Sequence, residues 1–403
     1  MIPAAARQAS VTGASGMRMP RLDYWLLGSV LALAALGLVM VASASITLAE
    51  RELGQPFYYA IRQGIYICLG ALIGVAVYRV QLRWLQQGGL VLLVGGLALL
   101  VAVLIPGIGH EVNGSVRWIN TGLFRLQVSE PAKLMILIYL ASYLARHGEE
   151  VRTHISGFIK PLGLLVLASL LLLLEPDFGA TVVLVATAMG MIFIAGVRLL
   201  QFSGVLGLAS LALTGMAVSS PYRMERLTTF LNPWADPFNS GFQLTQSLIA
   251  IGRGEWFGVG LGASIQKLFY LPEAHTDFVF AVLAEEIGLL GVFIVIALYV
   301  LLVWRAFAIA AQAEKAGNAF AALLAYGMGI WFGLQSFINM GVNMGLLPTK
   351  GLTLPLMSYG GSSMVVMCAA VALLLRVDYE TRCTVNGLPA SGTAPARQRG
   401  RRA

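Results

Sequence analysis

Charged side chains are scarce in this sequence of 403 residues. Asp, Glu, Lys and Arg together account for 11% of it, whereas hydrophobic residues account for 58%. This composition excludes a soluble globular chain, and the apolar stretches leave no room for an independent soluble domain. The scarcity of charge therefore indicates a polytopic integral membrane protein.

Cysteine is also scarce, and its three residues follow no metal-binding or pairing pattern. Cys68 and Cys368 fall inside apolar runs, and Cys383 lies near the C-terminus. This distribution argues against a disulfide framework and against a zinc site. The net charge of +8 comes from Lys and Arg scattered through short loops and from an Arg-rich end. This scattered distribution of basic residues indicates membrane topology and contact with membrane lipids. No nucleic acid is expected as a partner.

The chain does contain a series of long apolar stretches. A membrane-spanning helix needs about 20 mostly apolar residues, and a helix satisfies its own backbone hydrogen bonds in lipid. We therefore predict an all-α fold with ten transmembrane helices in a membrane domain of residues 23–380. The tails at 1–22 and 381–403 are expected to be disordered. The predicted spans are about 24–46, 60–78, 87–105, 131–146, 161–174, 178–196, 200–219, 278–304, 319–343 and 356–376.

Lys and Arg are distributed unevenly between the two sides of the predicted bundle. With ten spans both termini lie on one side, and that side carries 17 of the 27 Lys and Arg residues. Cytoplasmic loops are enriched in these residues, so both termini are predicted to be cytoplasmic. The periplasmic side then carries one long loop, about 220–276, between the seventh and eighth spans. A surface helix is predicted within it near residues 243–251.

Asp277 has the most informative position among the acidic residues. It opens the eighth span, because Thr276 is placed to cap the helix and the Asp277 carboxylate then lies in its first turn. The helix N-terminus stabilises the charged form of such a carboxylate, while desolvation raises its pKa toward that of a useful base. Position alone leaves two interpretations open, a charged helix start and a general base.

Two further sets of charges fall at or within predicted spans. Glu130 and Lys133 are three residues apart at the start of the fourth span. They can pair with each other, or Lys133 can face a cavity and meet an anionic substrate. Glu285 and Glu286 lie two turns into the eighth span, where an unpaired charge is costly, so partners are expected for both.

The periplasmic side also carries a turn with two carboxylates and several cations. Asp177 is expected to cap the sixth span, and the alternative is a divalent cation held by Glu175 and Asp177. His275 is expected to be a solvated loop residue, with an accessory role as the alternative. Cations that converge on one cleft suit a diphosphate, and otherwise they are rim charges. The candidates are Arg117, Arg125, Arg253, Lys267 and Lys350.

Glycines at positions 258, 260 and 262 are spaced like those of a nucleotide-binding loop. That motif requires a preceding strand, and none is predicted here. We therefore predict no nucleotide cofactor.

Five motifs, in order along the chain, resemble the SEDS family, named for shape, elongation, division and sporulation. They are NPWADP at 232–237, GFQLTQS at 241–247, KLFYLPEAHTDF at 267–278, LPTKG at 347–351 and SYGGSS at 358–363. The resemblance covers about residues 22–380. The first and fourth motifs are more similar to the division branch of the family than to its elongation branch.

The resemblance implies peptidoglycan glycosyltransferase activity, in which lipid II is polymerised into a nascent glycan strand. The reaction is expected on the outer face of the cytoplasmic (inner) membrane at the division septum. A class B penicillin-binding protein, the septal transpeptidase FtsI, is implied as a partner, together with the divisome regulators FtsQ, FtsL and FtsB. Residues that match the family's motifs are the catalytic Asp277 and the substrate-binding Glu130 and Lys133.

The chemistry of this implied reaction gives roles to Asp277 and to the remaining candidates. Asp277 is expected to take a proton from a sugar hydroxyl while undecaprenyl diphosphate leaves. Nearby cations, or Mg²⁺ or Mn²⁺, are expected to offset the charge of that leaving group. Further substrate-binding candidates are Arg117, Arg125, Lys350, His275 and Thr276. Candidates for a structural or accessory role are Glu175, Asp177, Glu285 and Ser358.

Two other functions share many of these features, a lipid II flippase and a non-catalytic divisome scaffold. A transport path is expected to carry charge along its depth, whereas a base for polymerisation lies near one surface. Four residues at span ends on one side favour the enzyme, while Glu285 and Glu286 argue against it. The four are Asp277, Glu130, Lys133 and Lys350. A groove for the lipid is predicted between the fourth span, the eighth span and residues 344–361.

Overall fold

The computed structural model describes residues 22–112, 115–120, 122, 125–219, 224, 228–239, 241–268, 270–349 and 351–388. The tail predicted at 1–22 therefore lies outside the described residues except for Leu22. Of the tail predicted at 381–403, only 381–388 is described. The last helix runs on to Val385, so the second tail begins later than predicted.

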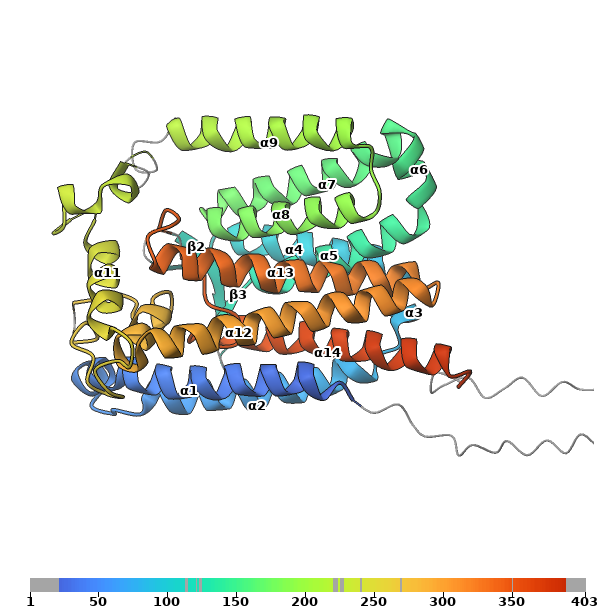
Figure 1. Ribbon diagram of the computed structural model, residues 1–403. Helices are drawn as coiled ribbons and strands as arrows, with labels where there is room; N and C mark the ends of the chain where they lie inside the picture. The colour runs from blue at the N-terminus through green and yellow to red at the C-terminus, as the bar shows by residue number, and fades with distance from the viewer. Residues whose placement is uncertain are drawn as a thin grey trace, which may run out of the picture.

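The fold is a bundle of long helices, and both described ends of the chain lie at the same end of it (Figure 1). Each of the ten predicted spans overlaps one long helix, and several helices extend beyond the predicted range. These helices are α1 (Tyr24–Leu53), α2 (Tyr58–Arg79), α4 (Gly89–Leu104), α5 (Ser129–Arg146), α7 (Ile155–Leu174), α8 (Phe178–Ile194), α9 (Leu199–Val218), α12 (Val279–Lys315), α13 (Ala319–Asn343) and α14 (Gly361–Val385).

Shorter elements connect the long helices. Helix α11 (Phe242–Gly254) confirms the surface helix predicted between the seventh and eighth spans, and it lies at the end of the bundle opposite the two chain ends (Figure 1). The others are α3 (Leu82–Gln87), α6 (Gly148–Thr153) and the 3₁₀ helix η1 (Pro233–Ala235).

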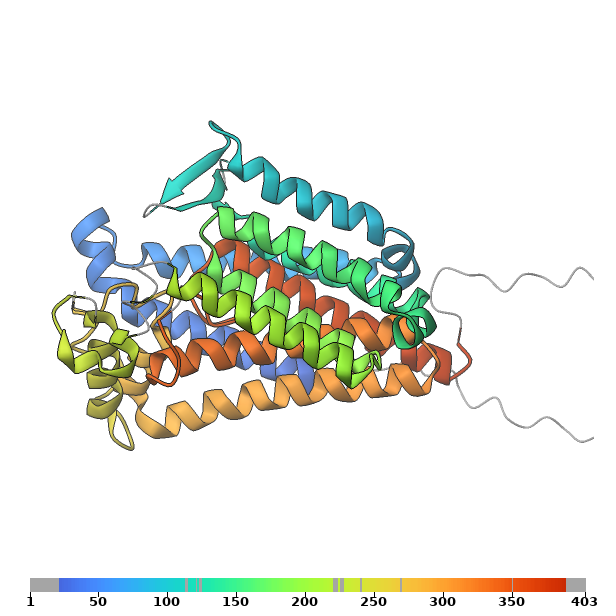
Figure 2. The same ribbon diagram turned by 90° about the horizontal axis from the view of Figure 1, so that it is seen from above.

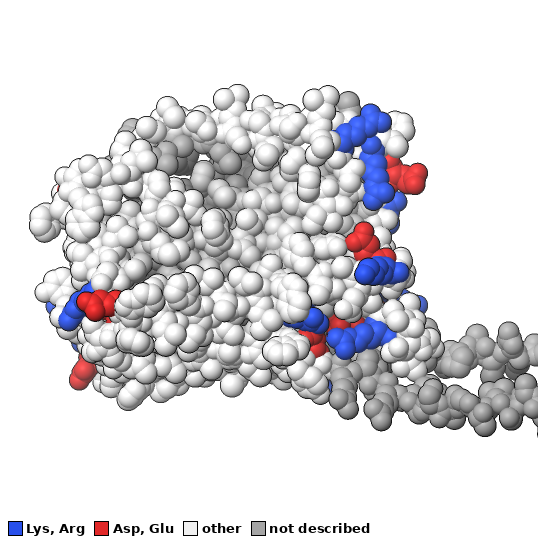
Figure 3. All heavy atoms as spheres, in the orientation of Figure 1, with Lys and Arg blue, Asp and Glu red and all other residues white. Residues whose placement is uncertain are grey.

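The helices have the length and surface of a multi-pass membrane protein. Within the described part of the chain, α1, α2, α7, α12, α13 and α14 are long and apolar enough to cross a membrane, and α4, α8 and α9 are shorter apolar helices. Figure 3 shows the charged side chains gathered toward the two ends of the visible face, with a wide uncharged band between them. Such a band matches the hydrocarbon layer of a bilayer.

The prediction of a purely helical fold is wrong in one place. The connection between the third and fourth predicted spans contains an antiparallel sheet of β1 (Gly109–Val112), β2 (Ser115–Asn120) and β3 (Arg125–Gln127), in the order β1-β2-β3. Figure 2 shows this sheet at the end of α4. Strands of three to six residues are too short for a period-of-two pattern to be recognised in the sequence.

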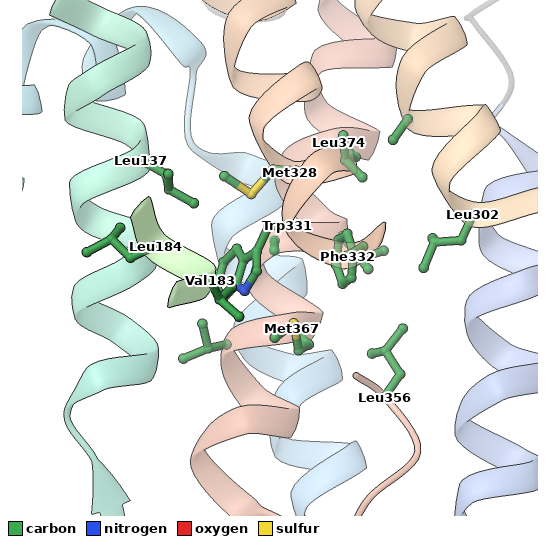
Figure 4. Packing of buried hydrophobic residues seen from close by; sticks show 14 of the residues in the cluster. Leu137, Val183, Leu184, Leu302, Met328, Trp331, Phe332, Leu356, Met367 and Leu374 are labelled. Atoms are coloured by element: carbon green, nitrogen blue, oxygen red, sulfur yellow. The ribbon is translucent and has the colours of Figure 1, made fainter. Parts of the chain in front are cut away.

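Helix α13 forms the centre of the bundle and packs against α5, α8, α12 and α14. Its Trp331 and Phe332 are completely buried. Figure 4 shows these two rings surrounded by apolar side chains of the neighbouring helices, such as Leu137 of α5, Val183 of α8 and Met367 of α14. The polar residues of α13 described below are therefore held by a closely packed core.

Helix α12 is interrupted at Gly288, whose φ of 78° and ψ of −168° are not helical. Residues 255–260 cross the helix at this break and take over its backbone hydrogen bonds: Leu289 N donates to Glu255 O at 2.9 Å, and Val259 N donates to Glu285 O at 2.9 Å. A Cβ at Gly288 would lie 2.4 Å from Gly258 N. Glycine is thus required by both the backbone angle and the close approach.

Replacing Gly288 by alanine should destabilise the protein by at least about 1–3 kcal/mol, because the side chain adds a clash to a strained left-handed backbone. The melting temperature in detergent measures this loss. Gly204→Ala in α9 is the matched control, because a Cβ there meets nothing within 4 Å. Equal melting temperatures for the two variants would show that the crossing does not depend on Gly288.

Candidate active site

Asp277 lies in the turn that leads into α12 and is half-buried. The helix begins at Val279, and Phe278 occupies the cap position without a side-chain hydrogen bond. The predicted cap by Thr276 is therefore wrong. The Thr276 hydroxyl instead donates to the Glu273 carbonyl at 3.1 Å and to its carboxylate at 2.7 Å, because local side-chain bonds compete with capping.

The backbone of Asp277 is bound by helix α13. Its carbonyl oxygen accepts hydrogen bonds from Asn339 Nδ2 at 2.9 Å and from Asn343 Nδ2 at 3.0 Å. The carboxylate reaches toward the segment after α13, since a Cβ at Gly351 would lie 3.2 Å from Asp277 Oδ2. The start of α12, the end of α13 and the segment beginning at Gly351 thus meet around this carboxylate.

Glu130 and Lys133 form the ion pair that their spacing predicts. Lys133 Nζ lies 2.8 Å from Glu130 Oε1, and the two side chains are 1% and 4% exposed. The ammonium also donates to Gln335 Oε1 at 3.4 Å and lies 5.1 Å from the centre of the Trp331 ring. The second interpretation, in which Lys133 meets an anionic substrate, stays a prediction.

The ion pair and Asp277 contact the same face of α13. Lys133 bonds Gln335, and Asp277 is bonded by Asn339, one helical turn further along. These two amide residues are separated by a rise of about 6 Å along the helix axis. The structure therefore attaches Lys133 and the backbone of Asp277, which lie 144 positions apart in the chain, to adjacent turns of one helix.

The predicted cations are held in different places. Arg117 Nε donates to the Glu175 carbonyl at 3.1 Å, and its Nη2 donates to the Pro176 carbonyl at 2.5 Å, so it fastens the turn between α7 and α8. Arg125 is exposed at the start of β3. Lys350 lies outside the described residues. A contact of these three residues with a substrate stays a prediction.

The turn between α7 and α8 confirms the predicted cap. Asp177 Oδ1 accepts from Ala180 N at 3.0 Å, and its Oδ2 accepts from Ser129 Oγ at 3.0 Å. Neither carboxylate oxygen of the buried Glu175 has a hydrogen-bond partner among the described residues. Burial, and secondly the charge of Asp177, raises the pKa of Glu175 to about 8, against the lowering effect of Arg117. Glu175 is therefore protonated at pH 7.

Stability should fall as the pH rises from about 4.5 to about 8, because the unfolded chain releases the Glu175 proton in this range while the folded protein keeps it. Glu175→Gln removes this ionisation, so its melting temperature should exceed that of the wild type increasingly toward pH 8. Melting curves over this range measure the difference. Glu111→Gln, at an exposed carboxylate, is the control. A constant gap between Glu175→Gln and wild type would contradict the raised pKa.

His275 is not the solvated loop residue that the sequence suggests. It is 9% exposed, and its ring centre lies 4.7 Å from that of Tyr59 and 5.6 Å from that of Tyr359. Burial lowers the pKa of His275, although the charges of Glu273 and Glu52 oppose this effect. Its carbonyl accepts from Tyr359 N at 3.0 Å, which ties the turn before Asp277 to the segment before α14.

Ser358 has the structural role predicted as one alternative. Its hydroxyl accepts from Leu354 N at 2.8 Å and closes the turn that precedes α14. Its carbonyl accepts from Gln63 Nε2 of α2 at 3.1 Å.

Glu285 and Glu286 have the partners that their position in α12 requires. Glu285 lies 2.9 Å from Arg253 Nη1 and accepts from Ser264 Oγ at 2.5 Å. Glu286 lies 2.9 Å from Lys267 Nζ and accepts from Ser43 Oγ of α1 at 2.6 Å. Both glutamates precede the Gly288 break, so these charges fasten residues 253–267 to one end of α12.

Comparison with known proteins decides the family. A family model described as a cell cycle protein, FtsW/RodA/SpoVE, matches residues 24–383. The chain belongs to this family. The resemblance to SEDS proteins is thereby confirmed over essentially the whole membrane region.

Curated relatives of this FtsW/RodA/SpoVE member belong to the division branch. A protein of Thioalkalivibrio sulfidiphilus named "Probable peptidoglycan glycosyltransferase FtsW" is 61% identical over 361 residues, which cover 90% of both chains. A protein of Nitrosococcus halophilus with the same name is 59% identical, covering 94% of this chain and 97% of the other. The similarity to the division branch is therefore confirmed.

Solved structures of similar proteins share the fold. A chain from a study titled "Structural coordination of polymerization and crosslinking by a peptidoglycan synthase complex" has a TM-score of 0.71 and 32% identity, covering 89% of this chain and 98% of the other. The rod shape determining protein RodA of Thermus thermophilus has a TM-score of 0.66 and 30% identity, covering 90% of this chain and 97% of that protein.

Sequence reasoning missed three functional candidates in this family member: Gln335, Asn339 and Asn343 of α13. A signal for them was present, because amide side chains recur every four residues in an otherwise apolar span. Their partners are backbone carbonyls and a lysine from three distant segments. No pattern in the sequence identifies such partners.

Proposed function

We propose that this chain is a peptidoglycan glycosyltransferase of the FtsW type, which polymerises lipid II into glycan strands. The observation that carries the proposal is the shared face of α13. It holds the Asp277 carbonyl and the Lys133 ammonium one helical turn apart, next to the segment that begins at Gly351. An aspartate and a lysine held by one helix face suit a reaction in which a hydroxyl loses a proton and a diphosphate leaves.

In the proposed reaction, the Asp277 carboxylate takes the proton from the 4-hydroxyl of the acceptor sugar. The hydroxyl oxygen then forms a bond with the anomeric carbon of the donor strand. The bond from that carbon to the diphosphate oxygen breaks, and undecaprenyl diphosphate leaves with the electron pair. Lys133 offsets the negative charge on the diphosphate. One base suffices for this inverting displacement, so no carboxylate nucleophile is required.

A divalent cation, Mg²⁺ or Mn²⁺, belongs to the proposal as a companion of the diphosphate. The described residues contain no group of three or more His, Cys, Asp or Glu side chains that could hold a metal ion. Asp177 is engaged by Ser129 and Ala180, and Glu175 is buried with a raised pKa, so the turn between α7 and α8 offers no free carboxylate to a cation. Such a cation would take most of its ligands from phosphate oxygens and water, as Mg²⁺ commonly does.

The proposed topology has ten transmembrane helices, both termini in the cytoplasm and a periplasmic segment between α9 and α12. Two observations support it. A long helix overlaps each of the ten predicted ranges, and both described chain ends lie at one end of the bundle. Asp277 then lies at the periplasmic surface. The groove for lipid II is proposed between α5, α12 and residues 344–361.

The proposed partners are a class B penicillin-binding protein, FtsI, and the regulators FtsQ, FtsL and FtsB at the division septum. The synthase complex of polymerisation and crosslinking among the similar structures supports the class B partner, and the FtsW names of the curated relatives support a role in division. The flippase alternative loses its main support, because Glu285 and Glu286 bind residues 253–267 at one end of α12.

The proposal is tested with the purified chain, its class B partner and fluorescent lipid II, scored for glycan polymer on a gel. We expect polymer in this assay and no lipid II translocation when the chain is placed in vesicles without the partner. Translocation without polymer would establish the flippase instead. Absence of both activities from the folded complex would leave the scaffold.

A further inference from the structure

Helix α13 carries a row of buried amide side chains at four-residue spacing. Gln335, Asn339 and Asn343 are 0%, 2% and 0% exposed, and we call these three residues the α13 amide ladder. Residues four apart lie on the same face of a helix. A buried amide in an apolar span is costly unless it forms hydrogen bonds, so its partners indicate what the ladder does.

Two members of the ladder hold the start of α12. Asn339 and Asn343 both donate to the Asp277 carbonyl, at 2.9 and 3.0 Å. Asn343 Oδ1 also accepts from Ala281 N at 3.1 Å, in the first turn of α12. That helix has no side-chain cap of its own, so a residue of another helix supplies an acceptor to its first turn, where Ala281 N also donates to the Phe278 carbonyl at 3.0 Å.

The ladder also holds the opposite side of the site. Asn339 Nδ2 donates to the Leu352 carbonyl at 2.6 Å, and Gln335 Nε2 donates to the Thr353 carbonyl at 3.0 Å. Gln335 Oε1 accepts from Lys133 Nζ at 3.4 Å. The same face of α13 therefore binds the Asp277 turn, the segment at 352–353 and the lysine of α5.

We propose that Asn339 and Asn343 are positioning residues that place the Asp277 carboxylate relative to Lys133 and residues 351–353. This inference rests on the proposed function, because it takes Asp277 as the base. The two amides bind the carbonyl of that residue, so the Cβ direction of Asp277 depends on them. A displacement of about 1 Å at a reacting group lowers the rate by about 10²-fold.

The test uses Asn339→Ala and Asn343→Ala in complex with the class B partner, with kcat and KM for lipid II measured separately. We expect kcat to fall by about 10- to 100-fold while KM changes by less than about twofold. Ser336→Ala is the matched control. This buried hydroxyl lies in the same helix and donates only to carbonyls of that helix, Phe332 O at 2.7 Å and Gly333 O at 3.1 Å.

A second variant decides the matter where the alanine variants do not fold. Asn343→Gln keeps the amide but moves it outward by one methylene, and it should lower kcat by about tenfold at a normal KM. The proposal is overturned if the folded Asn339 and Asn343 variants keep a normal kcat. It is also overturned if Ser336→Ala loses kcat to the same extent. If Asp277→Asn remains fully active, the proposed function fails. If Asp277→Asn is inactive and the asparagine variants are normal, only the positioning role fails.

Discussion

Replacing Asp277 by asparagine should lower the rate of lipid II polymerisation by about 10²- to 10⁴-fold, the usual contribution of a general base. Asparagine has nearly the same shape as aspartate but cannot accept the proton of the sugar hydroxyl. The bonds from α13 reach the backbone carbonyl of residue 277, so the substitution leaves them intact. We therefore expect an unchanged melting temperature together with the loss of polymer.

The control for this experiment is Glu273→Gln. Glu273 lies in the same turn and its carboxylate accepts from Thr276 Oγ1, but it is exposed. We expect it to keep nearly normal activity. A normal rate for Asp277→Asn would remove Asp277 from the chemistry. Equal losses in the two variants would mean that the turn as a whole, and not one carboxylate, supports the reaction.

Lys133→Met should destabilise the protein by about 3–5 kcal/mol, because it leaves the Glu130 carboxylate buried without its cation. Both side chains are almost fully buried and lie 2.8 Å apart. Thermal unfolding in detergent measures the loss. Lys160→Met is the matched control: Lys160 lies 3.3 Å from Glu150 but is 60% exposed. An exposed pair contributes only about 0–1 kcal/mol, so this variant should unfold near the wild-type temperature.

The double variant Glu130→Gln with Lys133→Met separates the two roles that the sequence left open for Lys133. Removing both charges should restore most of the lost stability, because no uncompensated charge remains. If Lys133 also offsets charge on the diphosphate, the stable double variant should still polymerise lipid II at least about 10-fold more slowly than wild type. Recovery of both stability and activity would show that the pair is structural only.

The sequence predicted the helices far better than the site. Apolar runs of membrane length locate a helix wherever they occur, because the backbone in lipid has to bond within itself. The cap of α8 by Asp177 and the pair of Glu130 with Lys133 were predictable for a similar reason, since both depend on neighbours within one turn. The three-stranded sheet was missed because its strands are too short for a period to be recognised.

Two local predictions were wrong because distant groups or local side chains changed the outcome. Thr276 bonds Glu273 instead of capping α12, and Asn343 of α13 supplies an acceptor to that helix. His275 is buried between Tyr59 and Tyr359, which come from α2 and from the segment before α14. The bond of Thr276 to Glu273 is local, but Asn343, Tyr59 and Tyr359 are distant in the sequence, and no pattern near positions 275–281 indicates contacts with them.

Composition and hydrophobic pattern by themselves determined that this is a helical membrane protein, and the order of its motifs determined its family. Each apolar run and each motif consists of residues that are close in the sequence. Only the tertiary structure decided which groups meet around Asp277, because its partners are amides of α13 and a loop 74 positions further along the chain. Buried amides bond wherever packing brings an acceptor within reach, and packing is a property of the whole bundle.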